Sequence, residues 1–121
     1  MTRYYLDTYA IIEIIKGKES YKKFSSLRLY TSIFNLYELY YSLLRDFGEE
    51  IAKKYFLYFK KNMVLINDEY IFAASKFKLK YVKKCLSYAD CLGYIIALKN
   101  DMKFLTGDKE FEDLENVEFV K

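Results

Sequence analysis

The stretch LSYADCLGYIIALKNDMKFLT, residues 86–106, combines a helix signal with a strand signal. Apolar side chains cover most of the circumference of a helix over residues 86–101, which is typical of a helix buried on most sides. KFLT (103–106) follows directly and is typical of a buried strand. Asp90 is the only charged side chain between Lys84 and Lys99. Because burying an unpaired charge costs several kcal/mol, this aspartate needs a partner or a structural role.

A local structural role is available to Asp90. Ser87 stands three residues before it, and this spacing matches a capping box, in which the serine accepts a hydrogen bond from the later amide and the acid reaches back. Such caps occur at many helix starts. The segment alone therefore leaves two interpretations open, a helix cap and a functional site.

Strand and helix signals alternate along the whole chain. The strand candidates are RYYL (3–6), RLYTS (28–32), MVLI (63–66), KFLT (103–106) and VEFV (117–120). The helix candidates span residues 8–16, 19–26, 33–47, 49–62, 68–81 and 86–101. This alternation predicts a single α/β domain over residues 1–121, with helices on both faces of a mostly parallel five-stranded sheet.

The composition limits the chemistry that the chain can perform. Its 121 residues include 14 tyrosines and 10 phenylalanines but no histidine, proline or tryptophan. Without histidine there is no imidazole base, no Ser-His triad and no histidine metal site. Any catalysis would use carboxylates, lysines, hydroxyls or thiols.

The sequence carries no signal for export or membrane insertion. Asp7 and Glu13 interrupt the apolar N-terminal stretch, which therefore does not match a signal peptide. No apolar run approaches the ~20 residues needed to span a bilayer. Cys85 and Cys91 fit no zinc motif, and we expect both to be reduced core residues. We expect a cytoplasmic protein without membrane contact.

Two further aspartates stand where predicted strands end. Asp7 directly follows RYYL, and Asp108 follows KFLT after one glycine. In open parallel sheets, sites form outside the carboxyl ends of the strands. Each aspartate also has a local interpretation, Asp7 as the N-cap of the helix starting at Thr8 and Asp108 as a turn residue. Glu38 is a fourth candidate acid, although an exposed polar stripe on its helix explains it equally well.

Convergence of these four acids would require a cation. Two unit charges ~4 Å apart repel by about 4 kcal/mol at an effective dielectric constant of ~20. A site made of carboxylate oxygens, without histidine or cysteine, suits Mg²⁺ or Mn²⁺, which keep bound waters and coordinate substrate phosphates.

Four segments together resemble a known family. YYLDTYAII, NLYEL, LSYADCLGYIIA and FLTGDKEF have the order and approximate spacing of PIN-domain nucleases, and the small size resembles the VapC-type toxins of toxin–antitoxin systems. The resemblance implies a three-layer α/β/α fold whose five-stranded sheet has the strands before Asp7 and Asp108 adjacent at its centre. It also implies that the catalytic and metal-binding acids are Asp7, Glu38, Asp90 and Asp108, supported by Thr8, Asn35, Thr106 and Glu110.

The same resemblance implies an Mg²⁺- or Mn²⁺-dependent endoribonuclease that is the toxin of a VapBC-type pair. RNA would be cut to leave a 3′ hydroxyl and a 5′ phosphate. The expected protein partners are a second copy of the chain, in a homodimer, and a cognate antitoxin that covers the acidic groove. A basic segment would contact RNA phosphates, although lysine-rich helices are also typical of a solvated face; it contains Lys76, Lys78, Lys80, Lys83 and Lys84.

Two other functions remain open at this point. One is a catalytically inactive member of the same fold that binds RNA or protein. The other is a receiver-type phosphoacceptor domain with Asp68, after MVLI, as the acceptor. A receiver would carry a pair of acids after its first strand, whereas RYYLDTYA has only one.

Overall fold

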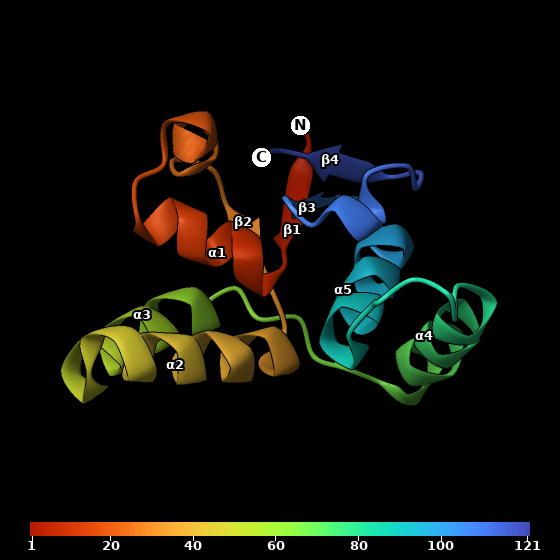
Figure 1. The fold of residues 1–121 in the computed structure, drawn as a ribbon, viewed down its shortest axis with the longest axis horizontal. Coiled ribbons are helices and arrows are strands. Elements are labelled where there is room, and N and C mark those ends of the chain that lie inside the picture. Colours follow the sequence, from red (N-terminus) through yellow and green to blue (C-terminus); the bar gives the residue numbers. More distant parts are fainter.

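A parallel sheet forms the centre of the fold (Figure 1). The computed structural model describes residues 1–121. Its strands lie in the order β2-β1-β3-β4, and every neighbouring pair is parallel. The strands are β1 (Arg3–Leu6), β2 (Leu29–Tyr30), β3 (Met102–Thr106) and β4 (Val117–Phe119). The prediction that the strands before Asp7 and Asp108 are central neighbours is confirmed, because β1 and β3 pair over four residues.

The sheet has four strands, and the predicted fifth strand over residues 63–66 is absent. Met63 forms only an isolated bridge to Thr31, and the amide of Val64 donates to the carbonyl of Thr31 at 2.8 Å. Strand β2 is too short to pair with a longer segment, because helix α2 begins directly after Ser32. With one residue left to pair against, a ladder cannot continue, and Leu65 is exposed.

Five of the six predicted helices are α-helices whose ends differ from the prediction by a few residues, and the sixth, over residues 19–26, is a shorter 3₁₀ helix. The α-helices are α1 (Thr8–Ile15), α2 (Ile33–Phe47), α3 (Glu49–Lys60), α4 (Asp68–Lys80) and α5 (Tyr88–Lys99). Residues Glu19–Phe24 and Lys109–Phe111 form the short 3₁₀ helices η1 and η2. Gly48 allows the tight turn between α2 and α3, because its φ of 92° is in the region that favours glycine.

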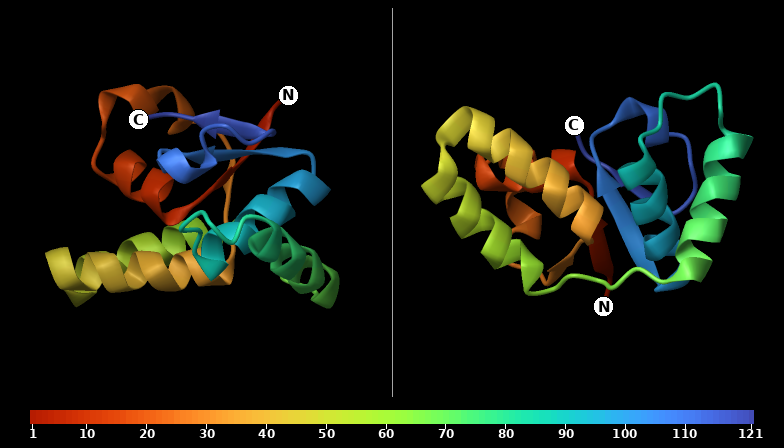
Figure 2. Two further views of the ribbon diagram at one scale, coloured as in Figure 1. Left: turned by 45° about the vertical axis from the view of Figure 1, so that its right-hand side comes forward. Right: turned by 90° about the horizontal axis from the view of Figure 1, so that it is seen from below.

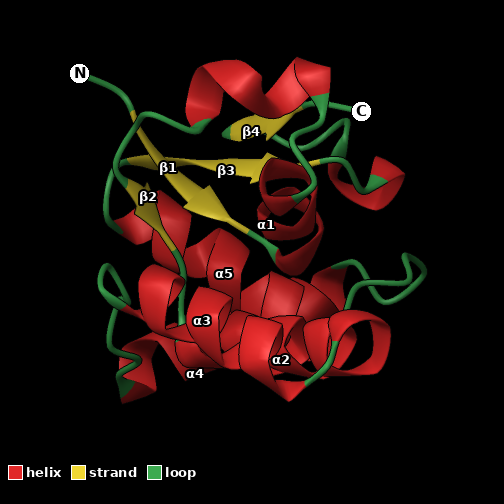
Figure 3. Cartoon of the chain, turned by 90° about the vertical axis from the view of Figure 1, so that its left-hand side faces the viewer, coloured by secondary structure: helices red, strands yellow, loops and turns green.

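Alternating side chains of the central strands point to two separate cores. Tyr5 and Phe104 pack with α4 and α5 on one face, whereas Leu6 and Leu105 pack with α1, α2 and α3 on the other. The view from below shows α2 and α3 on one side of the strands and α4 and α5 on the other (Figure 2, right). Figure 3 shows the strands side by side, in the order β2-β1-β3-β4. The predicted three-layer α/β/α arrangement is therefore confirmed.

The burial of α5 explains its apolar sequence. Eight of its residues are buried, because the helix lies between the sheet and α4. Cys91 is among them, but Cys85 is exposed in the preceding loop, so the expectation of two core cysteines is wrong for Cys85. No helix is both long enough and apolar enough to cross a bilayer.

Candidate active site

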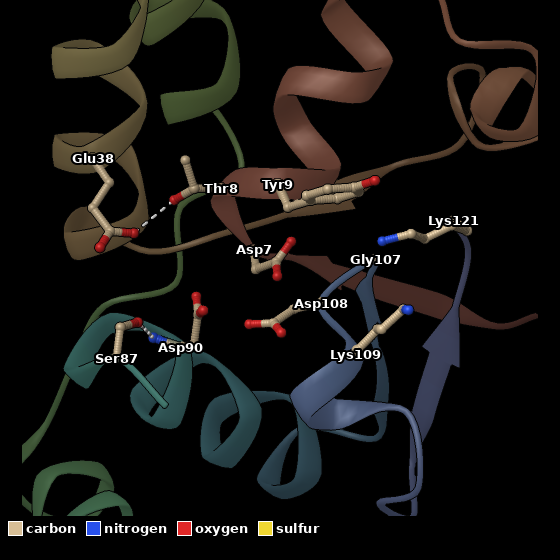
Figure 4. Close-up of a pocket in the computed structure, with 10 residues that line it drawn as sticks. All are labelled: Asp7, Thr8, Tyr9, Glu38, Ser87, Asp90, Gly107, Asp108, Lys109 and Lys121. Atoms are coloured by element: carbon tan, nitrogen blue, oxygen red, sulfur yellow. Dashed lines mark hydrogen bonds between the residues drawn. The ribbon is translucent and has the colours of Figure 1, made fainter. Parts of the chain in front are cut away.

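Adjacent strand ends bring two of the predicted acids to one edge of the sheet. Leu6 of β1 pairs with Leu105 of β3, so Asp7 and Asp108 leave the sheet close together. A pocket of about 490 Å³ opens at this edge (Figure 4). Its lining residues are Asp7, Thr8, Tyr9, Glu38, Ser87, Asp90, Gly107, Asp108, Lys109 and Lys121. All four predicted acids therefore line one pocket, and in Figure 4 the carboxylates of the three aspartates point toward a common centre.

Asp7 is a buried carboxylate with both oxygens engaged. Its Oδ1 accepts a hydrogen bond from the amide of Ala10 at 2.8 Å, which caps α1, and its Oδ2 accepts from the hydroxyl of Thr106. The side chain is only 1% exposed. Burial, and then the charge of Asp90, raise the pKa of Asp7 to about 8. Asp7 therefore caps α1 and lines the pocket at the same time.

Asp90 occupies the first turn of α5, where its backbone and side chain have different partners. The hydroxyl of Ser87 accepts from the Asp90 amide at 3.0 Å, which caps the helix. The carboxylate does not reach back to Ser87; its Oδ1 instead accepts from Nδ2 of Asn35 at 3.4 Å. Burial, and then the charge of Glu38, raise the pKa of Asp90 to about 6. A capping box alone therefore does not account for this carboxylate.

Thr106 links the remaining strand-end acid to Asp7. The Asp108 amide donates to the Thr106 hydroxyl at 3.0 Å, and the same hydroxyl donates to Asp7. Oδ1 of Asp108 accepts from the amide of Glu110 at 3.0 Å and caps η2. Glu110 itself does not line the pocket, and its contact with the acids is made by its backbone.

Glu38 and its supporting residues form the outer wall of the pocket. The Thr8 hydroxyl donates to Oε1 of Glu38 at 2.8 Å, and Nδ2 of Asn35 donates to the same hydroxyl at 3.1 Å. Glu38 is exposed, whereas Asn35 is fully buried. Thr8 therefore contacts Glu38 at the wall of the pocket, and Asn35 contacts Asp90 from beneath it.

The donor set of the pocket fits a hard divalent cation. All four acids offer oxygen, and at Asp7 and Asp90 burial first, and then a neighbouring carboxylate, raise the pKa. No group of three or more acidic or thiol side chains is already arranged to hold a metal ion. This arrangement suits Mg²⁺, which usually takes one or two carboxylates and completes its shell with waters and phosphate oxygens.

The lysines nearest the acids are not those that the sequence suggested. None of the five lysines between residues 76 and 84 lines the pocket; they lie on α4 and the loop that follows it. Within this group, Lys84 pairs with Asp113 at 3.2 Å, and the Lys78 ammonium lies 4.7 Å from the ring centroid of Tyr88. The pocket is instead lined by Lys109 and Lys121, which sequence reasoning missed. The position of Lys109 directly after Asp108 was the available signal.

Gly107 is a further pocket residue that the sequence did not single out. A Cβ atom at this position would lie 2.1 Å from Cε1 of Tyr9 and 2.7 Å from the carbonyl oxygen of Val120. The backbone contact cannot be relieved by rotating a side chain. Glycine in TGD therefore allows β3, β4 and α1 to approach one another at the edge of the pocket.

Comparison with known proteins identifies the family. The family model of the PIN domain matches residues 4–117, which include all four acids. The chain belongs to the PIN domain family. At the level of single sequences, no curated protein matches this PIN domain.

Solved structures share the fold over nearly the whole chain. VapC20 of Mycobacterium tuberculosis, described as a sarcin-ricin loop cleaving toxin, has a TM-score of 0.77 at 15% identity, covering 98% of this chain and 99% of that chain. VapBC2 from Rickettsia felis has a TM-score of 0.74 at 19% identity and covers 99% and 100% of the two chains. VapBC-1 from nontypeable Haemophilus influenzae has a TM-score of 0.73 at 20% identity and covers 98% and 96%. At these identities the similarity establishes that this PIN domain has the fold of those toxins.

Proposed function

We propose that this protein is an Mg²⁺- or Mn²⁺-dependent endoribonuclease and the toxin of a VapBC-type toxin–antitoxin pair. The observation that carries the proposal is the gathering of Asp7, Glu38, Asp90 and Asp108 around one pocket in a PIN domain. Burial and the neighbouring carboxylates raise the pKa values of Asp7 and Asp90, and shifted pKa values of this kind cluster at functional sites. The toxin assignment is supported by the structural neighbours, of which one is an RNA-cleaving toxin and others are VapBC complexes.

In the proposed reaction, water attacks a phosphodiester phosphorus and the bond to the 3′ oxygen breaks. A bound Mg²⁺ or Mn²⁺ ion would supply a water of lowered pKa and would stabilise charge on the phosphate oxygens. Asp7, Asp90 and Asp108 would hold the ion directly or through water, and Glu38 would orient the attacking water. The Thr106 hydroxyl holds Asp7, and the Thr8 hydroxyl holds Glu38. The products are a 3′ hydroxyl and a 5′ phosphate.

We propose that positive and aromatic side chains around the pocket bind the RNA strand. Lys109 and Lys121 lie on the opposite side of the acids from Glu38 and would contact phosphates (Figure 4). The lysines of α4 and the loop after it would contact phosphates farther from the acids. Exposed tyrosines on α2 offer flat surfaces for unpaired bases.

RNA cleavage tests the function directly. With millimolar Mn²⁺, the wild-type protein should cut a structured RNA pool, and EDTA should stop the reaction. Asp7→Asn should lower the rate on the order of 100-fold or more, because it removes a carboxylate that holds the ion. The matched control is Asp113→Asn, an exposed acid paired with Lys84 outside the pocket, which should cut normally.

The rival interpretation of an inactive scaffold makes the opposite prediction. An inactive member would bind RNA without cutting it. Adding Mn²⁺ would then raise the melting temperature of the wild type by no more than it raises that of Asp90→Asn. That pair of results would end the nuclease proposal. The receiver alternative required Asp68 to follow a strand over residues 63–66. Asp68 instead begins α4 and follows no strand.

A further inference from the structure

A buried chain of hydrogen bonds lies directly beneath the acids. It begins at the hydroxyl of Tyr5, which lies on β1 two residues before Asp7 and is completely buried. This hydroxyl lies 2.6 Å from Oγ of Ser32 and 2.6 Å from Oδ1 of Asn35. Both partners are also fully buried, so water cannot replace either bond.

The chemistry of the groups sets the direction of these bonds. Oδ1 of Asn35 is a carbonyl oxygen and can only accept, so the single proton of the Tyr5 hydroxyl is donated to it. The hydroxyl of Ser32 must then donate to the Tyr5 oxygen. Tyr5 therefore holds the side-chain amide of Asn35 with its carbonyl oxygen toward the buried Tyr5 hydroxyl.

The opposite end of the same amide faces the pocket. Nδ2 of Asn35 lies 3.4 Å from Oδ1 of Asp90 and 3.1 Å from the hydroxyl of Thr8, which donates to Glu38. If the amide were reversed, its oxygen would face the Asp90 carboxylate, and two acceptors would repel each other. The orientation of one amide thus determines whether two pocket acids are held or repelled.

We infer that Tyr5 is a positioning residue, whose hydroxyl holds the Asn35 amide so that Asp90 and, through Thr8, Glu38 are held ready for a divalent cation. Tyr5 itself is buried and does not line the pocket. The inference rests on the proposed function, because it assumes that these acids hold an ion.

Packing alone does not require the Tyr5 hydroxyl. The ring stacks on Phe104 with centroids 5.9 Å apart, and Gly93 makes room for it, since a Cβ there would lie 2.5 Å from Cε1 of Tyr5. Phenylalanine would make the same ring contacts. Replacing Tyr5 by phenylalanine therefore separates positioning from packing.

Mn²⁺ binding measured by titration calorimetry tests the inference. Tyr5→Phe should bind Mn²⁺ about 10-fold more weakly than wild type, the usual scale for losing a group that orients metal ligands. The matched control is Tyr94→Phe, because Tyr94 is also buried and its hydroxyl donates to the carbonyl of Glu115 at 2.6 Å, outside the pocket. Both variants should have a lower melting temperature than wild type, because each loses a buried hydrogen bond. Tyr94→Phe, however, should bind Mn²⁺ like wild type.

A double variant shows whether Tyr5 acts through Asn35. In an Asn35→Ala background, adding Tyr5→Phe should not weaken Mn²⁺ binding further, because the amide that Tyr5 orients is gone. The inference would be overturned if Tyr5→Phe bound Mn²⁺ as tightly as wild type, or if Tyr94→Phe lost as much Mn²⁺ affinity as Tyr5→Phe. It would also be overturned if Tyr5→Phe weakened Mn²⁺ binding in the Asn35→Ala background as much as it does in wild type. If the wild type itself bound no Mn²⁺, both this inference and the proposed function would fail.

If Tyr5→Phe did not fold, the wild-type protein would still decide the question. Adding Mg²⁺ should shift the NMR signals of the Asn35 side-chain amide and of the Tyr5 ring together, while those of Tyr94 stay in place. A shift at Asn35 without one at Tyr5 would overturn the inference.

Discussion

Single carboxylates in this protein combine a structural role with a place in the pocket. A carboxylate has two oxygens, and Asp7 uses Oδ1 to cap α1 and Oδ2 to accept from Thr106. Asp108 likewise caps η2 while lining the pocket. At Asp90 the division is between backbone and side chain, because the amide is capped by Ser87 while the carboxylate turns to Asn35. The local and functional interpretations of these residues are therefore compatible.

Asp7 should make the stability of the metal-free protein fall as pH rises. Its pKa is raised from 3.8 to about 8, so in this interval the folded chain retains a proton that the unfolded chain has lost. The free energy of unfolding then decreases from the lower pH to the higher one. Asp7→Asn cannot ionise, and it should lose less stability over the same interval. Urea unfolding in EDTA, at about pH 5 and about pH 8, measures the difference.

The exposed acid Asp113 provides the control for this prediction. Asp113→Asn should retain the pH dependence of the wild type, because its carboxylate is exposed and outside the pocket. If Asp7→Asn and wild type lost the same stability with rising pH, the proposed burial of an uncompensated charge at Asp7 would be wrong.

Helix α2 connects the core to the surface beside the pocket. Leu36, Leu39 and Leu43 are buried on one face, while Tyr37 and Tyr41 are 71% and 60% exposed on another. These tyrosines line a hollow of about 430 Å³, together with Thr8, Glu38, Ser42 and Arg45. Because Thr8 and Glu38 also line the acidic pocket, the two hollows lie next to each other. The helix thus places aromatic rings next to the acids.

Removing the exposed rings of α2 should weaken RNA binding. Stacking of one base on an aromatic ring is worth about 1–3 kcal/mol, so Tyr37→Ala with Tyr41→Ala should reduce affinity for single-stranded RNA by at least ~10-fold. Fluorescence anisotropy with a labelled oligonucleotide, in an Asp7→Asn background that prevents cutting, measures this.

Tyr58 is a suitable control for the α2 tyrosines. It is 58% exposed on α3 and lines neither hollow. Tyr58→Ala should bind RNA normally. If the double variant at Tyr37 and Tyr41 bound RNA normally but failed to bind a protein partner, these two tyrosines would be assigned to protein contact instead.

The molecule as a whole has an apolar groove that its own fold leaves uncovered. The groove has a volume of about 680 Å³ and lies between α2, α4 and α5. Several of its large apolar residues are strongly exposed, including Leu79 at 74% and Val82 at 70%. Exposed apolar surface of this kind is typical of a protein interface. We propose that the chain forms a homodimer in which a second copy covers this groove.

A charge placed in the groove should separate the homodimer. Leu79→Glu should convert a dimer to a monomer, because the carboxylate would have to be buried without a partner. Size-exclusion chromatography with light scattering measures the mass, for which the monomer value is 14.6 kDa. Leu57→Glu, at a position 61% exposed on α3 and outside the groove, should leave the mass unchanged. A monomeric wild type would refute the prediction.

Sequence reasoning succeeded where the determinants were local or repeated along the chain. Alternating strand and helix signals predicted the layers, and strand-end positions predicted that Asp7 and Asp108 would meet. It failed at residues 63–66, whose strand-like composition was outweighed by the shortness of β2. It also missed Lys121, which lies far along the chain from Asp7 and has no local motif.

The order of the elements and the identity of the acids could be predicted from the sequence, because hydrophobic periodicity and the residues that form turns and helix caps act over a few positions. The contacts among those acids depended on three dimensions. The Tyr5 hydroxyl meets Ser32 and Asn35 only after β1 and α2 have packed, and Asn35 meets Asp90 across 55 residues of sequence. Such bonds form because packed elements exclude water and leave each buried polar atom only the partners that the tertiary structure brings to it, and no short-range pattern records those partners.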